Sequence, residues 1–295
     1  MENKVIIHIG YPKTGTTWFA NNFYPKIKDF YFVPPETIIS ELISNNYLKI
    51  SEKLSKHNKL IISDPEFCGV IKYNWNNGIY RQQIAEHLKI LFPNAQIIIF
   101  IRNQIEFLAS SYVYYIRKGG TQKPLELFNS MINSEFSIPL EYMEYHKIIQ
   151  LYQDLFGTNN IHVFLYEEFL ENNFNFIKNY ISIFNFDLSY SSVNYKPLNE
   201  MLKKPLLNFI RFTNKFTNKE VKNKKVVFHI PFIYEIINKN YSTFNKFLFF
   251  GNKPNIQELF DNKTLDFLNN YFSKSNNKLI DNMELSLIKK YKYPI

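Results

Sequence analysis

The segment Gly10–Trp18 constrains this chain more than any other part of the sequence. It reads Gly-Tyr-Pro-Lys-Thr-Gly-Thr-Thr-Trp and directly follows the apolar run Val5–Ile9. A β-branched run that breaks at a glycine and restarts at threonines predicts a strand, a tight loop and a helix start. Backbone N–H groups at a helix start lack intrahelical partners, and the helix dipole adds partial positive charge. With Lys13 in the loop and the Thr16 and Thr17 hydroxyls in the first turn, the segment predicts a cradle for a phosphate-like dianion.

The loop differs from the phosphate-binding loop of kinases and NTPases. That loop reads G-x-x-x-x-G-K-[ST], with its lysine after the second glycine. Gly10 and Gly15 have the required separation, but Thr16 stands where the lysine should be, and the lysine has moved to position 13. The sequence therefore predicts anion recognition without the usual clamp on the β- and γ-phosphates.

A second anion site is predicted after the strand expected over Gln96–Ile101. NTPases of this kind usually carry an acidic Mg²⁺ ligand at the end of such a strand, whereas Arg102 and Asn103 stand here. A helical pattern over Gln104–Arg117 follows and places Ser110 in its second turn, within reach of an anion held by Arg102. Both residues would lie at the carboxyl ends of parallel strands, where open α/β sheets bind their ligands.

The two predicted sites together resemble those of the sulfotransferases that use 3′-phosphoadenosine-5′-phosphosulfate (PAPS). Pro12–Trp18 is similar to their loop for the 5′-phosphosulfate, and Arg102 and Ser110, together with Asn103, are similar to their 3′-phosphate site. Phe272–Leu279 and Lys290–Pro294 resemble closing segments of bacterial carbohydrate-type sulfotransferase domains. The resemblance therefore extends over nearly the whole chain.

The resemblance implies PAPS as the co-substrate and adenosine 3′,5′-bisphosphate (PAP) as the product. It assigns nine residues to this nucleotide: Pro12, Lys13, Thr14, Gly15, Thr16, Thr17, Trp18, Arg102 and Ser110. Trp18 either packs near the adenine or is buried within its helix. Because PAP is a good leaving group, no metal is expected.

Catalysis of sulfuryl transfer depends mostly on positioning and electrostatics, because its transition state is loose and charge builds on the leaving oxygen. Lys13 is the candidate to stabilise that charge, and the acceptor needs a general base. Ser63–Gly69 resembles the Ser-x-Glu-x-x-Ser-Gly stretch of bacterial carbohydrate-type members, but Pro65 stands where they carry glutamate. We favour Glu66 as the base, with Asp64 as the second candidate. The alternative is that both are loop carboxylates that cap the next element.

Alternation of strand and helix patterns predicts an α/β fold, a P-loop-like three-layer arrangement with a central parallel sheet and a helical C-terminal part. Strands are expected over Val5–Ile9, Phe30–Val33, Leu60–Ser63, Gln96–Ile101 and Ile161–Leu165. Helices are expected over Thr16–Phe23, Thr37–Ser44, Ile79–Leu91, Gln104–Arg117, Pro139–Phe156, Glu167–Phe184, Met201–Phe216, Phe232–Lys239, Tyr241–Phe249 and Thr264–Tyr271. One sulfotransferase domain is expected over residues 1–295, with a nucleotide-binding core over 1–186 and a helical part over 187–295.

The composition limits the expected cellular location of the protein and the kinds of partner that it binds. Cys68 is the single cysteine, which excludes an internal disulfide framework. The first strand begins almost at residue 1 and no apolar run approaches the roughly 20 residues of a membrane helix, so a cytoplasmic location is expected, with peripheral membrane contact allowed. The net charge of +9 indicates either attraction of anionic ligands or a general excess of solvated lysines. The basic residues form no helical stripe, so nucleic acid is not an expected partner.

The leading functional hypothesis is a sulfotransferase that moves a sulfuryl group from PAPS to a hydroxyl or amine. The resemblance favours a carbohydrate or glycolipid acceptor. A P-loop nucleotide kinase or NTPase is the second hypothesis, against which Thr16 and Arg102 argue. The third is a catalytically inactive sulfotransferase-like binding protein, which the displaced glutamate at Pro65 keeps open.

Overall fold

The chain forms two units that alternate along the sequence. The computed structural model describes residues 4–69, 78, 80–132, 140–196, 201–217, 224–248, 250–283 and 285–295. The sheet unit comprises Met1–Asn103, Ser137–Leu198 and Phe272–Ile295, and the helical unit comprises Gln104–Phe136 and Asn199–Tyr271. The sequence suggests one division near residue 187, whereas the structure has four junctions, because the chain leaves the sheet unit twice and returns to it twice.

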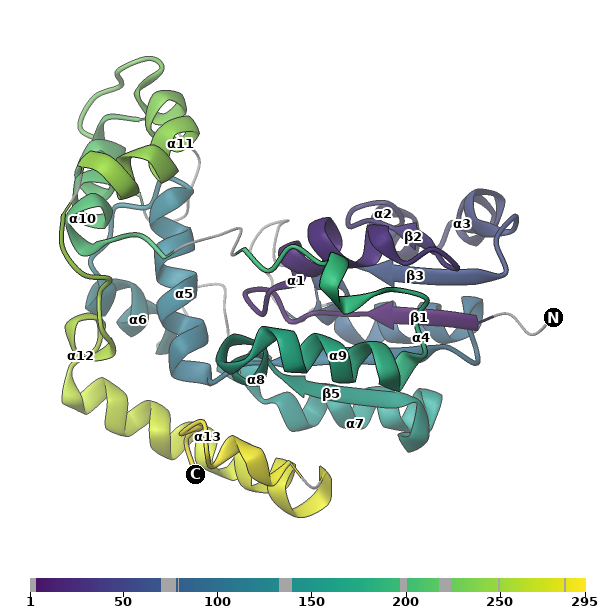
Figure 1. Ribbon diagram of the computed structural model, residues 1–295. Coiled ribbons are helices and arrows are strands. Elements are labelled where there is room, and N and C mark those ends of the chain that lie inside the picture. Colours follow the sequence, from purple (N-terminus) through teal and green to yellow (C-terminus); the bar gives the residue numbers. More distant parts are fainter. Residues whose placement is uncertain are drawn as a thin grey trace. The chain divides into compact units, whose positions relative to one another are not determined.

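A five-stranded parallel sheet forms the centre of the sheet unit (Figure 1). Its strands are β1 (Lys4–His8), β2 (Tyr31–Val33), β3 (Lys59–Ser63), β4 (Gln96–Ile101) and β5 (Ile161–Leu165). Their order is β2-β3-β1-β4-β5, and all four neighbouring pairs are parallel. Runs of isoleucine and valine suit strands that are buried on both faces. The expected α/β fold with a central parallel sheet is confirmed.

Helices cover both faces of the sheet (Figure 1). The helices of this unit are α1 (Thr16–Trp18), α2 (Ile39–Ile43), α3 (Tyr47–Leu54), α4 (Arg81–Leu91), α7 (Tyr145–Phe156), α8 (Tyr166–Glu171) and α9 (Asn173–Phe184). On one face, Ile6 and Phe100 of the sheet pack in an aromatic core with Phe19 and Tyr180, and the Phe19 and Phe100 rings lie 4.9 Å apart. On the other face, α7 contacts β4 and β5 and packs against α4.

Several predicted helices differ from the observed ones. The helix expected over Thr16–Phe23 is α1 followed by a π-helical turn over Phe19–Phe23. The helix expected over Glu167–Phe184 is divided into α8 and α9, because the side chain of Asn172 accepts a hydrogen bond from the Asn175 N–H at 3.0 Å and caps α9. The helix expected over Pro139–Phe156 is a 3-10 turn over Leu140–Met143 followed by α7. The two helices expected over Phe232–Lys239 and Tyr241–Phe249 are one helix, α11 (Ile233–Thr243), with a π-helical turn after it. The expected starts Ile79 and Pro139 lie outside the described residues.

The helical unit contains α5 (Gln104–Arg117), α6 (Pro124–Ile132), α10 (Lys204–Thr213), α11 (Ile233–Thr243) and α12 (Ile256–Leu259), and α13 (Asn262–Met283) begins in it. Asn214 joins α10 to the end of α5, because its Nδ2 donates to the carbonyl oxygens of Ile116 and Gly120, each at 2.7 Å. A π-helical turn over Phe244–Leu248 extends α11, and Phe249 lies outside the described residues. Within the described ranges, no helix combines the length and apolar character needed to cross a membrane.

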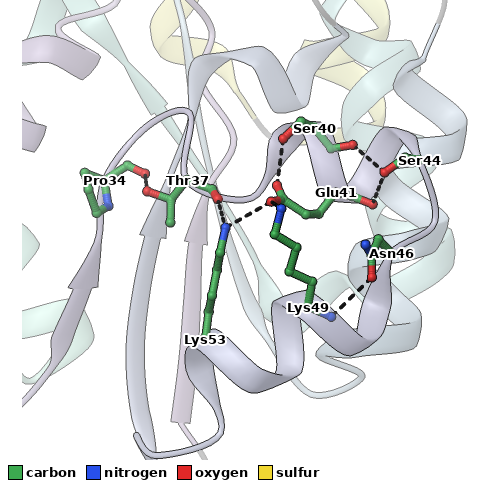
Figure 2. A network of polar contacts seen from close by, with 8 residues as sticks. All are labelled: Pro34, Thr37, Ser40, Glu41, Ser44, Asn46, Lys49 and Lys53. Atoms are coloured by element: carbon green, nitrogen blue, oxygen red, sulfur yellow. Dashed lines mark hydrogen bonds and ion pairs between the residues drawn. The ribbon is translucent and has the colours of Figure 1, made fainter.

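A buried carboxylate fastens α2 to α3 (Figure 2). The Glu41 side chain is 8% exposed, and its Oε1 lies 2.9 Å from Lys49 Nζ and 3.0 Å from Lys53 Nζ. Its Oε2 accepts a hydrogen bond from Ser40 Oγ at 2.7 Å. Lys53 Nζ also donates to the Thr37 carbonyl oxygen at 3.0 Å. The hydrogen bond from Ser40 and the two ammonium groups lower the pKa of Glu41 below its ordinary value of 4.5.

We expect Glu41→Gln to lower the free energy of unfolding at pH 7 by about 1 kcal/mol, because it removes charge-assisted hydrogen bonds whose lysine partners are partly solvated. Since the pKa of Glu41 is lower in the folded state than in the unfolded state, the carboxylate stabilises the fold above pH 4.5 and loses this effect as the pH falls further. Urea unfolding at a series of pH values measures the difference, which should shrink on acidification. Glu52→Gln, on the exposed side of α3, is the control. A pH-independent difference would contradict this account.

Candidate active site

The phosphate loop, residues 10–17, has a backbone that only glycine adopts easily at two positions. Gly10 has φ +111° and Gly15 has φ +83°. A Cβ at Gly10 would lie 3.1 Å from Cys68 Sγ, and a Cβ at Gly15 would lie 3.2 Å from the Tyr166 ring. Both positions therefore require glycine for two reasons: the positive φ of the turn, and the lack of space for a side chain. Lys13 also has a positive φ of 65°, which places it at the bend of the loop.

The loop leads directly into α1. The Gly15 carbonyl accepts hydrogen bonds from the backbone N–H groups of Trp18 at 2.8 Å and Phe19 at 3.1 Å. Inside the loop, Thr14 Oγ1 donates to the Tyr11 carbonyl oxygen. Thr17 is exposed at the start of α1. Since the first N–H groups of a helix have no intrahelical acceptor, this arrangement is the one that an anion cradle requires, and the binding of an anion here stays a prediction.

Arg102, at the end of β4, lies against the phosphate loop. Its Nη1 donates to the Lys13 carbonyl oxygen at 3.1 Å, and its guanidinium carbon lies 5.2 Å from the centre of the Tyr166 ring. Tyr145 Oη donates to the Arg102 carbonyl oxygen at 2.7 Å. The structure therefore brings two cationic residues, Lys13 and Arg102, to the same loop. Positive potential at the carboxyl edge of the sheet favours an anionic ligand there.

Ser110, the predicted partner of Arg102, is partly buried on α5. Arg102 belongs to the sheet unit and Ser110 to the helical unit. Their joint contact with a 3′-phosphate stays a prediction.

Glu167 and Asn103 hold the C-terminal segment beside Arg102 through hydrogen bonds. The sequence does not predict this role for either residue. Glu167 Oε1 accepts from the Asn103 backbone N–H at 2.8 Å, and its Oε2 accepts from Tyr293 Oη at 2.9 Å. Asn103 Nδ2 donates to the carbonyl oxygens of Tyr291 and Lys292, at 3.3 and 2.7 Å. Burial raises the pKa of Glu167. The side chain of Asn103 thus joins the end of β4 to residues almost 190 positions later.

Asp64 caps the turn that follows β3. Its side chain is buried, its Oδ1 accepts from the Glu66 N–H at 2.9 Å, and its Oδ2 accepts from the Glu36 N–H at 2.7 Å. Burial raises the pKa of Asp64 to about 6, although both hydrogen bonds oppose the shift. An aspartate followed by proline is typical of a helical N-cap followed by N1, and the turn here spans Pro65–Cys68. Since both oxygens of Asp64 bind backbone groups, Glu66, partly exposed on the turn, is the better placed candidate for a base.

Arg81 joins the phosphate loop to this turn, a role that the sequence does not reveal. Its Nε donates to the Cys68 carbonyl oxygen at 3.0 Å, and its Nη2 donates to Tyr11 Oη at 3.1 Å and the Tyr142 carbonyl oxygen at 3.0 Å. The guanidinium carbon also lies 4.9 Å from the centre of the Tyr142 ring. Cys68 Sγ donates to the Ile9 carbonyl oxygen at 2.9 Å. The loop, the turn and the segment before α7 are therefore held by one cation.

Trp18 and His8 lie in the core of the sheet unit. Trp18 is 5% exposed, and its ring centre lies 4.8 Å from that of Phe169, so it takes the buried alternative. His8 Nδ1 lies 3.0 Å from Tyr24 Oη, and burial lowers the pKa of His8 to about 3. Because the His8 ring is fully buried in this core, we do not expect it to reach an acceptor. Among the residues that the structure describes, no three or more His, Cys, Asp or Glu side chains are grouped as metal ligands.

Solved structures that resemble this one include sulfotransferases. Mouse sulfotransferase SULT7A1 in complex with PAP aligns over 98% of this chain and 88% of its own, with a TM-score of 0.52 and 14% identity. A sulfotransferase from Alicyclobacillus acidocaldarius aligns over 68% of this chain and 87% of its own, with a TM-score of 0.42 and 16% identity. A search among curated proteins found no match. The family model of the sulfotransferase domain matches residues 2–229, and the chain therefore belongs to the sulfotransferase domain family.

Proposed function

We propose that this protein transfers a sulfuryl group from PAPS to a hydroxyl or amine of an acceptor. The observation that carries the proposal is the contact of Arg102 with Lys13, in a loop that leads directly into the first turn of a helix. Membership of the sulfotransferase domain family and a structural neighbour that holds PAP support it. The Ser63–Gly69 stretch and the C-terminal segments favour a carbohydrate or glycolipid acceptor. We further propose that all 295 residues, both units included, act as one sulfotransferase domain.

The nucleotide would be held by its two phosphate-bearing ends. Backbone N–H groups of the phosphate loop and the hydroxyls of Thr16 and Thr17 suit the 5′-phosphosulfate. Arg102 and Ser110 would bind the 3′-phosphate, for which a guanidinium is the preferred partner. Trp18 is left out of these contacts, because the aromatic core buries it.

Two residues of the chain would then take part in the chemistry. The acceptor oxygen forms a bond to sulfur while the bond from sulfur to the bridging oxygen breaks, and the electron pair stays on the departing 5′-phosphate. The Lys13 ammonium would stabilise the charge on that oxygen. The Glu66 carboxylate would take the acceptor proton, because Asp64 is bound on both oxygens by backbone N–H groups.

We expect PAP to stabilise the protein much more than ADP does. At a concentration 100 times its Kd, PAP adds about 2.7 kcal/mol, which raises the Tm of a chain of this size by roughly 4–5 °C. ADP has no 3′-phosphate for Arg102, so at the same concentration we expect a rise of about 1 °C. Differential scanning fluorimetry measures both shifts, and Arg102→Met should reduce only the PAP shift, whereas Lys28→Met, at an exposed site of the sheet unit, should reduce neither.

Equal shifts from PAP and ADP would contradict the predicted 3′-phosphate site. A larger shift from ATP with Mg²⁺ would favour the nucleotide kinase or NTPase hypothesis. Transfer of ³⁵S from labelled PAPS to a panel of glycans and glycolipids tests the reaction itself. Tight PAP binding without transfer to any acceptor would favour a sulfotransferase-like binding protein.

A further inference from the structure

The positive charge of this chain is concentrated in one stretch. The chain has 35 Lys and Arg and 26 Asp and Glu residues. Residues 201–253 contain 11 of the former and 2 of the latter, and the rest of the chain contains 24 of each. The whole excess of +9 therefore belongs to this stretch of the helical unit. A general excess of solvated lysines would be spread over both units, so it does not explain this distribution.

The same stretch exposes an unusual amount of apolar surface. Eight consecutive residues, 225–232, are exposed, and six of them are Val, Phe, Ile or Pro. Val227 is 66% exposed, Phe228 56% and Phe232 73%. Scattered apolar residues on a surface are ordinary, but a contiguous exposed group marks an interaction site.

The exposed segment continues onto the end of α10. The Val227 N–H donates to the Lys215 carbonyl oxygen at 2.8 Å, and the Ile230 N–H donates to that of Phe216 at 2.9 Å. The Phe216 ring centre lies 4.9 Å from that of Phe228 and 5.2 Å from that of Phe212, which is itself 58% exposed. We call Phe212, Phe216, Val227, Phe228 and Ile230 the apolar ridge.

Three exposed lysines belong to the same stretch of the helical unit as the apolar ridge. They are Lys225, which directly precedes Val226 in the exposed segment, Lys239 on α11 and Lys246 in the turn after it. In the described part of this stretch, Glu235 is the one acidic residue. The helical unit thus combines exposed aromatic and branched residues with lysines, on α10, on α11 and on the chain between them. Figure 1 shows where these two helices lie in the chain.

We propose that this surface of the helical unit binds an anionic phospholipid membrane. Apolar side chains enter the boundary between headgroups and acyl chains, while lysines attract the anionic headgroups. A second copy of the chain is a poor occupant, because two stretches of the same charge, each +9, would repel each other. Nucleic acid would use the lysines but would leave the apolar ridge in water. The proposal goes beyond the transfer reaction and does not depend on it.

Binding to vesicles tests the proposal. Sucrose-loaded vesicles of phosphatidylcholine, with and without about a third phosphatidylglycerol, are sedimented with the full chain. We expect an apparent partition coefficient roughly tenfold or more higher for the anionic vesicles, and a strong decrease at about 0.5 M salt. Phe228→Trp adds a positional readout, because its emission should shift to the blue only when anionic vesicles are present.

Two triple variants separate the apolar and the electrostatic contributions. The first is Phe212→Ser, Val227→Ser and Phe228→Ser, and the second is Lys225→Gln, Lys239→Gln and Lys246→Gln. Each should lower the partition coefficient roughly tenfold or more. All six positions are exposed, so unchanged circular dichroism and Tm verify that the variants are folded.

Matched controls remove equally exposed residues of the sheet unit. They are Leu48→Ser, Ile90→Ser and Ile183→Ser for the apolar set, and Lys28→Gln, Lys56→Gln and Lys178→Gln for the lysines. Both controls should bind within about twofold of the parent chain.

Three results would overturn the proposal: no sedimentation with anionic vesicles, equal loss in the control variants, or a concentration-dependent dimer that the first triple variant abolishes. The last would assign the apolar ridge to a second copy of the chain. None of these results bears on sulfuryl transfer, which the ³⁵S assay measures with soluble acceptors.

Discussion

Replacing Lys13 by alanine should lower kcat for sulfuryl transfer by about two to three orders of magnitude. The ammonium would act on charge that develops only as the sulfuryl group departs, so its loss changes kcat more than the affinity for the nucleotide. PAP binding should weaken by roughly tenfold or less, because the loop N–H groups, Thr16 and Thr17 remain. Initial rates with labelled PAPS and calorimetric binding of PAP separate the two effects.

Glu66→Gln provides the comparison that distinguishes charge stabilisation from proton transfer. In a loose transition state the acceptor keeps most of its proton, so a base contributes at the low end of its usual range, about 10²-fold or less. The acidic limb of the pH–rate profile should disappear in Glu66→Gln and persist in Lys13→Ala. Lys56→Ala, at an exposed site of the sheet unit, is the control. Unchanged kcat in Lys13→Ala would remove the proposed role of this lysine.

Arg81→Leu should lower the free energy of unfolding by about 2–4 kcal/mol. The substitution leaves the Cys68 carbonyl without this donor and takes one donor from each of the Tyr11 hydroxyl and the Tyr142 carbonyl. It also removes the cation beside the Tyr142 ring. Urea unfolding gives the energy. Arg81→Lys should restore little of it, because one ammonium group cannot reproduce the fork of donors.

The effect of Arg81 should reach the nucleotide as well as the fold. Tyr11 belongs to the phosphate loop, and Cys68 ends the turn that carries Glu66. Loss of the hydrogen bonds from Arg81 should therefore make both the loop and the turn more mobile. We expect the stabilisation of the variant by PAP to fall by more than half, as measured by the shift in Tm. Gln82→Ala, at the next position of α4 and exposed, should change neither stability nor PAP binding. An Arg81→Leu protein with parental stability would contradict the assignment.

The sequence predicts the sheet well, because each strand has a short and unambiguous apolar run. The observed bounds of β4 and β5 are those expected, as are those of α5. It predicts helix interruptions poorly: Asn172 is one polar residue in a helical pattern, and its role as the N-cap of α9 shows only in the hydrogen bond that it accepts from the Asn175 N–H. The three-residue α1 is a similar case, because the π-helical turn after it has the same apolar pattern as an α-helix.

At the site, the sequence predicts the residues that would contact the nucleotide. It does not predict the residues that hold these contact residues in place. Gly15, Lys13 and Arg102 stand out because their types are unusual for a plain turn or strand end. Arg81 and Glu167 do not, since a cation at a helix start and an acid after a strand are ordinary in sequence. Their hydrogen-bond partners, which include Cys68 and Tyr293, are distant in sequence and can be recognised only in the folded chain.

The junction made by Asn103 has a consequence for biosynthesis. Its side chain needs the carbonyl oxygen of a residue that the ribosome adds 188 positions later. The contacts at the carboxyl end of β4 therefore cannot form in step with translation, because the helical unit is made before the residues that complete them. Deleting residues 290–295 should leave the sheet complete but should remove the acceptors of the Asn103 side chain. We expect such a chain to depend more on chaperones during synthesis.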